Sequence, residues 1–299
     1  MINVRTSRFA IILLLVFVSM AACASERNVD LRIVYKVSVS KLISKLEFKI
    51  VIPNTVRNRQ TVNNVSFSIQ PDTVYTNNSV TYALFKFYDL TKSFKIVFKS
   101  NMTIFNQVNQ KNDSIENDLT KYLAAEEFIE SESPKIVAVA ATLRQKTDIE
   151  TVMKTFDYVK KTISYELNPA IGAEKVLETH IGKCMDYSDL FVALLRANKI
   201  PAKSMFGAVV DYSGDDPLHA WPEAYLKKQG WVRFDPTGNQ SEIVQVDKNY
   251  VMKIANKYII LSQARNDSEL HKGFQYYYHY YCPDLKGDEI KIKVSYEIY

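Results

Sequence analysis

The stretch GKCMDYSDLFVALL, residues 182–195, places a cysteine at the start of an amphipathic helix. The helix is indicated by apolar side chains that recur at helical spacing, namely Tyr187, Leu190, Phe191, Leu194 and Leu195. Cys184 would then lie in the first turn, where unpaired backbone N–H groups and the positive end of the helix dipole stabilise a thiolate and lower the thiol pKa. The alternative is a buried and inert cysteine on a core helix.

A nucleophilic cysteine needs a base, and the base needs an acceptor that orients it. The chain contains only four histidines, which are His180, His219, His271 and His279. His219 begins the strand-like segment HAWPEAYL, and Asp235 ends the next one, WVRFDP. A hairpin through residues 227–230 would therefore bring an imidazole and a carboxylate to one end of a two-stranded unit.

The expected register of this hairpin does not place the two side chains opposite each other. With a four-residue loop, Leu226 faces Trp231, and His219 faces Gly238 rather than Asp235. A bulge, a longer loop or strong twist must make up the difference, and Pro222, which cannot donate a hydrogen bond to a ladder, is a candidate place for it.

The rest of the chain divides into regions of different periodicity. Residues 29–105 alternate apolar and polar side chains and are rich in Val, Ile, Phe and Tyr, which predicts an antiparallel β-sandwich without candidate catalytic groups. A polar stretch at 109–118 marks a boundary, helical patterns follow, and strands return after residue 200. The expected fold is α+β, with helices packed on an antiparallel sheet in the second domain. The expected domains are a signal peptide at 1–23, a β-sandwich at 24–108 and a catalytic domain at 112–299.

Three segments carry a more specific signal. GKCMDYSDLFVALLRANKIPAK, HAWPEAYL and GWVRFDPTGN resemble, in order and spacing, the three motif blocks of the transglutaminase-like superfamily, and the resemblance covers roughly residues 160–240. It implies a papain-like core in which Cys184 is the nucleophile, His219 the general base and acid, and Asp235 the orienting carboxylate. Pro222 and Lys183 depart from the family pattern without removing a reactive group.

The resemblance also implies a mechanism through a thioester, in which the Cys184 backbone N–H and a second donor hold the oxyanion. Tyr165 and Tyr187 are candidates to line the cleft or to assist the oxyanion, although packed tyrosines are the common alternative. Trp221 is expected either to line the cleft or to pack the sheet.

Composition excludes some partners. The net charge of +5 is modest and the Lys residues are scattered, so nucleic acid is not an expected partner. The histidines lack ligand spacing and the acidic segment VVDYSGDDPL lacks a calcium pattern, so neither a metal nor another cofactor is expected.

The N-terminus has the order of a secretory signal. Arg5 and Arg8 precede an apolar run that is followed by small residues. The segment MAAC resembles a bacterial lipobox, which makes Cys23 the expected lipidation site and a membrane the expected location, whereas ordinary signal cleavage and plain secretion are the alternative. In an exported protein structural cysteines usually pair, but a catalytic Cys184 would have to remain free of Cys282.

Together these features predict an exported, thiol-dependent enzyme that hydrolyses an amide or peptide bond. The expected substrates are peptides or proteins, with cell-wall peptide as one option. A protein-glutamine transamidase is the second hypothesis, and a non-catalytic surface protein that binds peptide or glycan is the third.

Overall fold

The computed structural model describes a large part of the chain. The described residues are 26–105, 118–167, 172–214, 216–238, 240–241, 243–246, 249–252, 256–263, 265–270, 278–284 and 289–299. The signal peptide expected at 1–23, with Cys23, and His271 lie outside them. Among the helices in these segments, none is long and apolar enough to cross a membrane.

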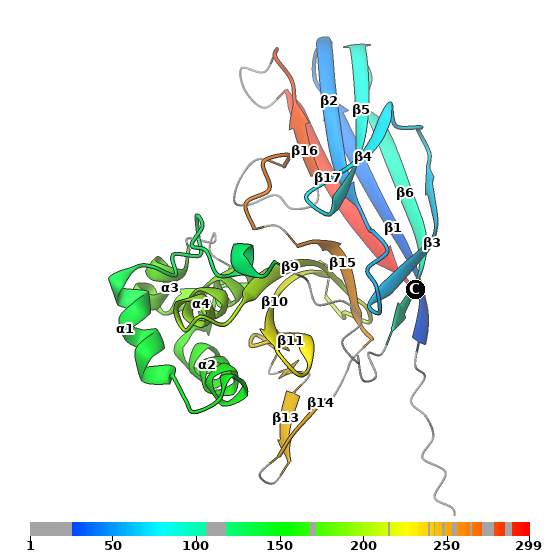
Figure 1. Cartoon of the computed structure of the whole chain (residues 1–299). Helices are drawn as coiled ribbons and strands as arrows, with labels where there is room; N and C mark the ends of the chain where they lie inside the picture. Colours follow the sequence, from blue (N-terminus) through cyan, green and yellow to red (C-terminus); the bar gives the residue numbers. More distant parts are fainter. Residues whose placement is uncertain are drawn as a thin grey trace, which may run out of the picture.

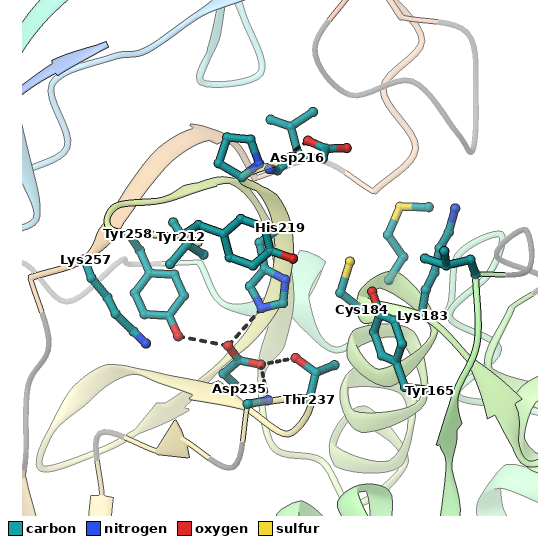
Figure 2. Close-up of a pocket in the computed structure, with 16 residues that line it drawn as sticks. Tyr165, Lys183, Cys184, Tyr212, Asp216, His219, Asp235, Thr237, Lys257 and Tyr258 are labelled. Carbon is teal, nitrogen blue, oxygen red and sulfur yellow. Dashed lines mark hydrogen bonds and ion pairs between the residues drawn. The ribbon is translucent and has the colours of Figure 1, made fainter. Parts of the chain in front are cut away.

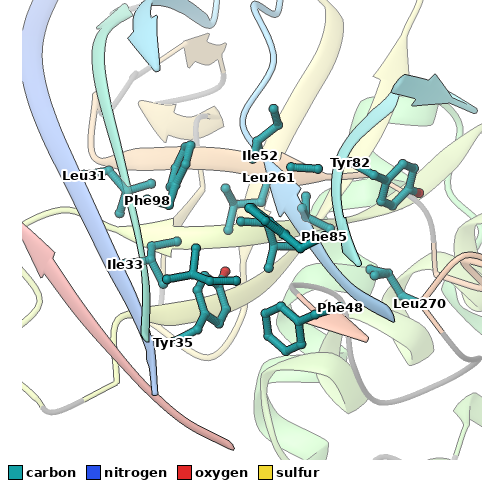
Figure 3. Close-up of a cluster of buried hydrophobic side chains, with 14 of the residues drawn as sticks. Leu31, Ile33, Tyr35, Phe48, Ile52, Tyr82, Phe85, Phe98, Leu261 and Leu270 are labelled. Carbon is teal, nitrogen blue, oxygen red and sulfur yellow. The ribbon is translucent and has the colours of Figure 1, made fainter. Parts of the chain in front are cut away.

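Two four-stranded antiparallel sheets form the predicted β-sandwich (Figure 1). The first has the order β17-β1-β6-β3, with β17 (Ile290–Ile298), β1 (Glu26–Val39), β6 (Phe94–Phe105) and β3 (Gln60–Phe67). The second has the order β16-β2-β5-β4, with β16 (Tyr278–Tyr281), β2 (Ile43–Ile52), β5 (Val80–Leu90) and β4 (Thr73–Asn77). Alternate residues of both sheets point inward, and Figure 3 shows the resulting core, in which Tyr35 and Phe48 meet edge to face with ring centroids 5.5 Å apart.

Each sheet of the sandwich takes one of its two edge strands from the far end of the chain. Strand β17 pairs along β1, with Val37 opposite Ile292, and β16 pairs with β2. This pairing differs from the expected assignment of residues 112–299 to a single separate domain. Period-two alternation indicates which face of a strand is buried but not which strand lies beside it, so sequence pattern alone could not place these two strands.

A second unit contains the helices and a five-stranded sheet, as expected for the α+β class. The sheet has the order β12-β11-β10-β9-β15, with β12 (Gln240–Ser241), β11 (Gly230–Asp235), β10 (Leu218–Leu226), β9 (Ala202–Val209) and β15 (Tyr258–Ser262). The helices are α1 (Pro134–Leu143), α2 (Asp148–Thr162), α3 (Ala173–Thr179) and α4 (Cys184–Ala197). Helix α4 is buried from its first residue to Arg196 because helices pack on one side of it and β9 and β10 on the other (Figure 1).

Smaller elements complete this unit. They are the 3₁₀ turn η1 (Thr120–Tyr122), the parallel pair β7 (Ser164–Tyr165) and β8 (Ile181–Gly182), and the hairpin of β13 (Ile243–Val246) and β14 (Asn249–Met252). Helix α2 begins with a capping box in which Thr147 and Glu150 satisfy each other's backbone N–H groups. Helix α1 begins at Pro134, a residue suited to the first helical position, and the N-cap residue Ser133 makes no side-chain cap hydrogen bond.

The two units are joined by consecutive residues just before and at the start of β3. The Gln60 side-chain amide donates to the carbonyl of Ile260 and accepts from its N–H, both at 2.8 Å, and thereby pairs with β15 as a strand backbone would. The Arg59 guanidinium donates to the carbonyl of Trp231 at 2.6 Å and lies 3.7 Å from the buried carboxylate of Glu223. Through these two residues the sandwich contacts β15, β11 and β10, and Ala208 of β9 and Leu261 of β15 also belong to its buried core.

Candidate active site

Cys184 is the first residue of α4 and its side chain is 8% exposed. The backbone before it is held in place, because the Asp186 carboxylate accepts a hydrogen bond from the Lys183 N–H at 2.9 Å. A side chain at Gly182 would collide with this arrangement, since a Cβ atom there would lie 2.4 Å from the Cβ of Asp186. The Gly-Lys-Cys order therefore fixes the thiol at the N-terminal end of the helix.

The β10–β11 hairpin has a shorter loop than expected. Leu226 pairs with Gly230 and Tyr225 with Trp231, so the loop contains three residues, and Gly230 adopts a φ of 74°, in the left-handed region that favours glycine. The expected pairing of Leu226 with Trp231 is thus wrong by one residue. In an antiparallel pair, a slip of one residue moves a side chain to the opposite face of the sheet.

The corrected register accounts for the meeting of the imidazole and the carboxylate. Extended along both strands, it places Asp235 opposite Trp221, which shares a face of β10 with His219. No bulge at Pro222 is needed to bring them together. The recorded β10–β11 ladder ends at Glu223, next to Pro222, as expected for a residue without an N–H.

Asp235 is 5% exposed and its two oxygens accept four hydrogen bonds (Figure 2). His219 Nε2 lies 2.8 Å from Oδ2, and the Tyr258 hydroxyl donates to the same oxygen at 2.9 Å. The Thr237 hydroxyl and the Gly238 N–H donate to Oδ1 at 2.5 and 3.2 Å. The carboxylate is therefore fixed in orientation by groups from β10, β15 and the turn after β11.

The charges of this group stabilise one another. Burial alone would lower the pKa of His219, but hydrogen bonds with Asp235 and Cys184 raise it to about 10. Burial likewise raises the pKa of Asp235, yet the bonds from His219, Thr237 and Tyr258 hold it at about 2. The pair is accordingly an imidazolium and a carboxylate at neutral pH. Because Nε2 faces Asp235, the other edge of the ring is available to the Cys184 thiol (Figure 2).

A cleft of about 580 Å³ opens onto these groups. It is lined by Tyr165, Leu167, Lys183, Cys184, Met185, Val209, Tyr212, Asp216, Pro217, Leu218, His219, Asp235, Thr237, Gly238, Lys257 and Tyr258. Among the described residues, no group of three or more His, Cys, Asp or Glu side chains has the arrangement of a metal site. The sequence-predicted Cys184, His219 and Asp235 thus share one cleft.

The three aromatic candidates behave differently. Tyr165 lines the cleft, where burial and the nearby charge of Cys184 raise its pKa to about 12. Tyr187 is a packed residue whose hydroxyl donates to the carbonyl of Ile163 at 2.5 Å. Trp221 is fully buried beneath the site, with its ring 4.9 Å from that of Tyr258, so it packs the sheet and does not line the cleft.

Sequence pattern missed other residues of the cleft. Thr237 belongs to the quoted segment GWVRFDPTGN, and its position two residues after Asp235 in a turn was a usable signal for a hydrogen bond to that carboxylate. Tyr258 and Lys257 had no such signal, because they arrive from a strand far along the chain that pairs with β9. Cys282, the other described cysteine, is a free thiol in the core of the sandwich, and Cys184 is free as well.

Comparisons with known proteins find similarity over the segment that contains Cys184, His219 and Asp235. The model of the transglutaminase-like superfamily matches residues 136–236. An uncharacterized protein, YebA of Bacillus subtilis strain 168, is 29% identical over 97 residues, which are 27% of this chain and 13% of that protein. A protein-glutamine gamma-glutamyltransferase of Pseudomonas aeruginosa is 29% identical over 128 residues, 35% of this chain and 18% of that protein. The matched segments thus cover less than a fifth of each relative.

A solved structure shares the fold over most of the chain. It is a proposed cysteine protease from Cytophaga hutchinsonii, with a TM-score of 0.64 and 16% identity over 92% of this chain and 91% of that one. At this identity the likeness concerns the fold, including the combination of a sandwich with a helical unit. The family model alone carries the assignment: its match contains Cys184, His219 and Asp235, so residues 136–236 of this chain form a transglutaminase-like superfamily domain.

Proposed function

We propose that this protein is an exported acyl-transfer enzyme that hydrolyses an amide or peptide bond through Cys184, His219 and Asp235. The observation that carries the proposal is the 2.8 Å contact between His219 and Asp235 in the cleft that Cys184 lines. A thiol at a helix start, an imidazolium beside it and a carboxylate that orients the ring are the components of a cysteine nucleophile with its acid and base. Membership of the superfamily supports an enzyme.

The proposed reaction proceeds in two steps. The Cys184 sulfur attacks the acyl carbon, and the oxyanion is stabilised by the Cys184 backbone N–H at the start of α4. His219 gives its proton to the leaving amine, the carbon–nitrogen bond breaks, and a thioester remains. Water, deprotonated by His219, then attacks the thioester and releases the acid and the thiolate.

Tyr165 is our candidate for the second oxyanion donor. It lines the cleft near Cys184, and its phenol, like that of any tyrosine, is protonated and able to donate at neutral pH.

Transamidation is the second candidate function, because an amine in place of water would take the acyl group from the same thioester. The name of the Pseudomonas aeruginosa relative, a protein-glutamine gamma-glutamyltransferase, favours this candidate. A non-catalytic peptide- or glycan-binding protein is the third, and the complete set of Cys184, His219 and Asp235 in one cleft weighs against it.

A library of peptides and small amides, assayed with and without an added primary amine, separates these functions. Hydrolysis predicts free acid in both assays, transamidation predicts an amine adduct, and a binding protein predicts neither. Cys184→Ala should abolish either product, whereas the matched Cys282→Ala variant should keep it, because Cys282 lies in the sandwich core. Product formation by Cys184→Ala would contradict a thiol mechanism.

Export with a lipid anchor on Cys23 is part of the proposal and rests on the N-terminal sequence. Labelled fatty acid should be incorporated into the protein in a bacterial host and should be absent from Cys23→Ser. Secretion of an unlabelled protein would contradict lipidation of Cys23 but would still agree with export.

A further inference from the structure

The cleft extends beyond the three proposed catalytic residues to Lys257. This residue immediately precedes β15, and its carbonyl accepts a hydrogen bond from the Val210 N–H at 2.7 Å, which fixes its backbone. Its half-buried side chain lines the cleft beside Tyr258 and Asp235 (Figure 2). The ammonium group lies over the Tyr258 ring, 5.4 Å from the ring centroid. A cation–π contact does not neutralise the charge, so the ammonium can still pair with a carboxylate of the protein or of a ligand.

Asp235 forms no ion pair with Lys257. Both oxygens of that carboxylate already accept two hydrogen bonds from other groups, and the structure records no ion pair between Lys257 and a carboxylate of the described residues. Burial lowers the pKa of Lys257, Asp235 opposes this effect, and the nearby Arg233 adds to it. An ammonium group partly removed from water is costly unless an anion compensates it, and a carboxylate on a bound ligand would do so.

The position of Lys257 in the cleft indicates which part of the substrate it would contact. In the proposed reaction His219 protonates the leaving amine, so the leaving portion lies on the His219 side of the cleft. Figure 2 shows Lys257 and Tyr258 on that side, whereas Tyr165 and Lys183 lie on the opposite side of Cys184. We infer that Lys257 binds a carboxylate carried by the leaving portion, so that the substrates are amides whose leaving amine is an amino acid or an acidic peptide.

This inference rests on the proposed function and adds the chemical class of the leaving group. The carboxylate has two sources, the free C-terminus of a peptide or the side chain of an acidic residue after the cleaved bond. Lys183 provides a matched control because it lines the same cleft on the other side of the thiol.

The first test compares peptides that differ only in the leaving residue: Glu against Gln, and a free C-terminus against a carboxamide. A charged partner for the ammonium should give the carboxylate form a kcat/KM about tenfold higher. Lys257→Gln should reduce that preference to near unity, and Lys257→Glu should reverse it toward a leaving residue that carries Lys. Lys183→Gln should retain the preference for carboxylate. Whichever peptide pair shows the preference identifies the source of the carboxylate.

A binding measurement separates this inference from the proposed function. Fluorescence anisotropy with Cys184→Ala should show about tenfold tighter binding of the carboxylate peptide than of its neutral twin, and the added Lys257→Gln change should remove the difference. Circular dichroism checks the fold of each variant, and Lys257→Met replaces Lys257→Gln if the latter unfolds. Turnover with equal kcat/KM for both peptides would contradict the inference about Lys257 but agree with the proposed enzymatic function. Selective binding of the carboxylate peptide without turnover would support the subsite and contradict the enzymatic function. The absence of both selective binding and turnover would contradict both proposals.

Discussion

Cys184 and Cys282 are equally buried, at 8% exposed each, but they lie in regions with different chemistry. Cys184 begins a helix and faces an imidazolium, whereas Cys282 follows an edge strand and belongs to the apolar core of the sandwich. Burial alone therefore does not decide whether a thiol is inert. The neighbours decide it, and each of the following experiments changes a neighbour in one region and compares the result with a matched change elsewhere.

The largest contrast is expected between the two thiols themselves. Cys184→Ala removes the nucleophile and should lower turnover of an amide substrate by on the order of 10⁴-fold or more. Cys282→Ala removes one buried sulfur and should lower the free energy of unfolding by about 1 kcal/mol, with little effect on turnover. Steady-state kinetics and urea unfolding measure both. Equal losses of turnover in the two variants would contradict the assignment of different roles to Cys184 and Cys282.

The second contrast concerns the reactivity of the thiols toward iodoacetamide. His219 remains an imidazolium well above neutral pH because its pKa is about 10, so a cation lies beside Cys184 at pH 6. Peptide mapping should find Cys184 alkylated well before Cys282, and His219→Ala should slow the reaction of Cys184 about 10- to 100-fold. Asp235→Ala should have a weaker effect, since it orients the ring. Indifference of Cys184 to His219 would contradict the catalytic proposal.

The hydrogen-bonded pair also predicts a pH window of stability. The pKa of His219 rises from 6.5 to about 10, so its contribution is complete below pH 6.5 and is lost as pH rises toward 10. The pKa of Asp235 falls from 3.8 to about 2, so its contribution is complete above pH 3.8 and is lost as pH falls toward 2. The pair should stabilise the protein most between pH 3.8 and 6.5.

Urea unfolding of the wild type and of Asp235→Asn, measured across pH, checks this window. The difference in unfolding free energy between them should be largest inside it and should shrink on both sides. A difference that does not vary with pH would show that the two groups do not titrate as a pair.

The join between the sandwich and the second unit predicts a smaller effect. Arg59→Met removes the hydrogen bond to the Trp231 carbonyl and a cation beside Glu223, and should lower the unfolding free energy by about 2 kcal/mol. Arg32→Met, which breaks the more exposed pair with Glu297 inside the sandwich, should cost about 0–1 kcal/mol. Thermal unfolding of both variants measures the contrast, and equal effects would show that Arg59 does not hold the units together.

The same join shows what the sequence could and could not predict. The motif blocks placed Cys184, His219 and Asp235 because each lies in a short local segment whose helix or strand pattern is strong. The partners of β16 and β17, and the approach of Gln60 to β15, are contacts between residues about 200 or more positions apart in the chain, and alternation says nothing about them. The hairpin register failed for a smaller reason, a glycine that shortens the loop by one residue.

These contacts also change the role of the sandwich. The sequence indicated a region without chemistry, and none of the residues that line the cleft comes from it. Residues 112–299 alone, however, would leave β16 and β17 without their partners and would lose Gln60 from β15. We therefore expect a truncation of the sandwich to expose apolar edges and to aggregate, which light scattering would detect.

The smallest expected effect tests whether the sandwich, through β15, helps to orient the Asp235 carboxylate. Gln60 holds β15 at Ile260, and Tyr258, two residues earlier on the same strand, donates to Asp235. Tyr258→Phe keeps the ring against Trp221 but removes one of the two donors to Oδ2, so the pKa of Asp235 should rise and the carboxylate should orient His219 less well. We expect kcat to fall about three- to tenfold with KM unchanged, and the acid limb of the pH profile to move upward.

Tyr187→Phe is the control for Tyr258→Phe, because it also deletes one buried hydroxyl bond, to Ile163, but lies outside the cleft. It should lower the unfolding free energy by about 1 kcal/mol and leave the acid limb where it is. If both variants lose only stability, Tyr258 merely packs the sheet, and the strand that the sandwich holds has no part in orienting Asp235. If only Tyr258→Phe moves the acid limb, the sandwich helps to position the Asp235 carboxylate through β15, because Gln60 holds that strand at Ile260, two residues from Tyr258.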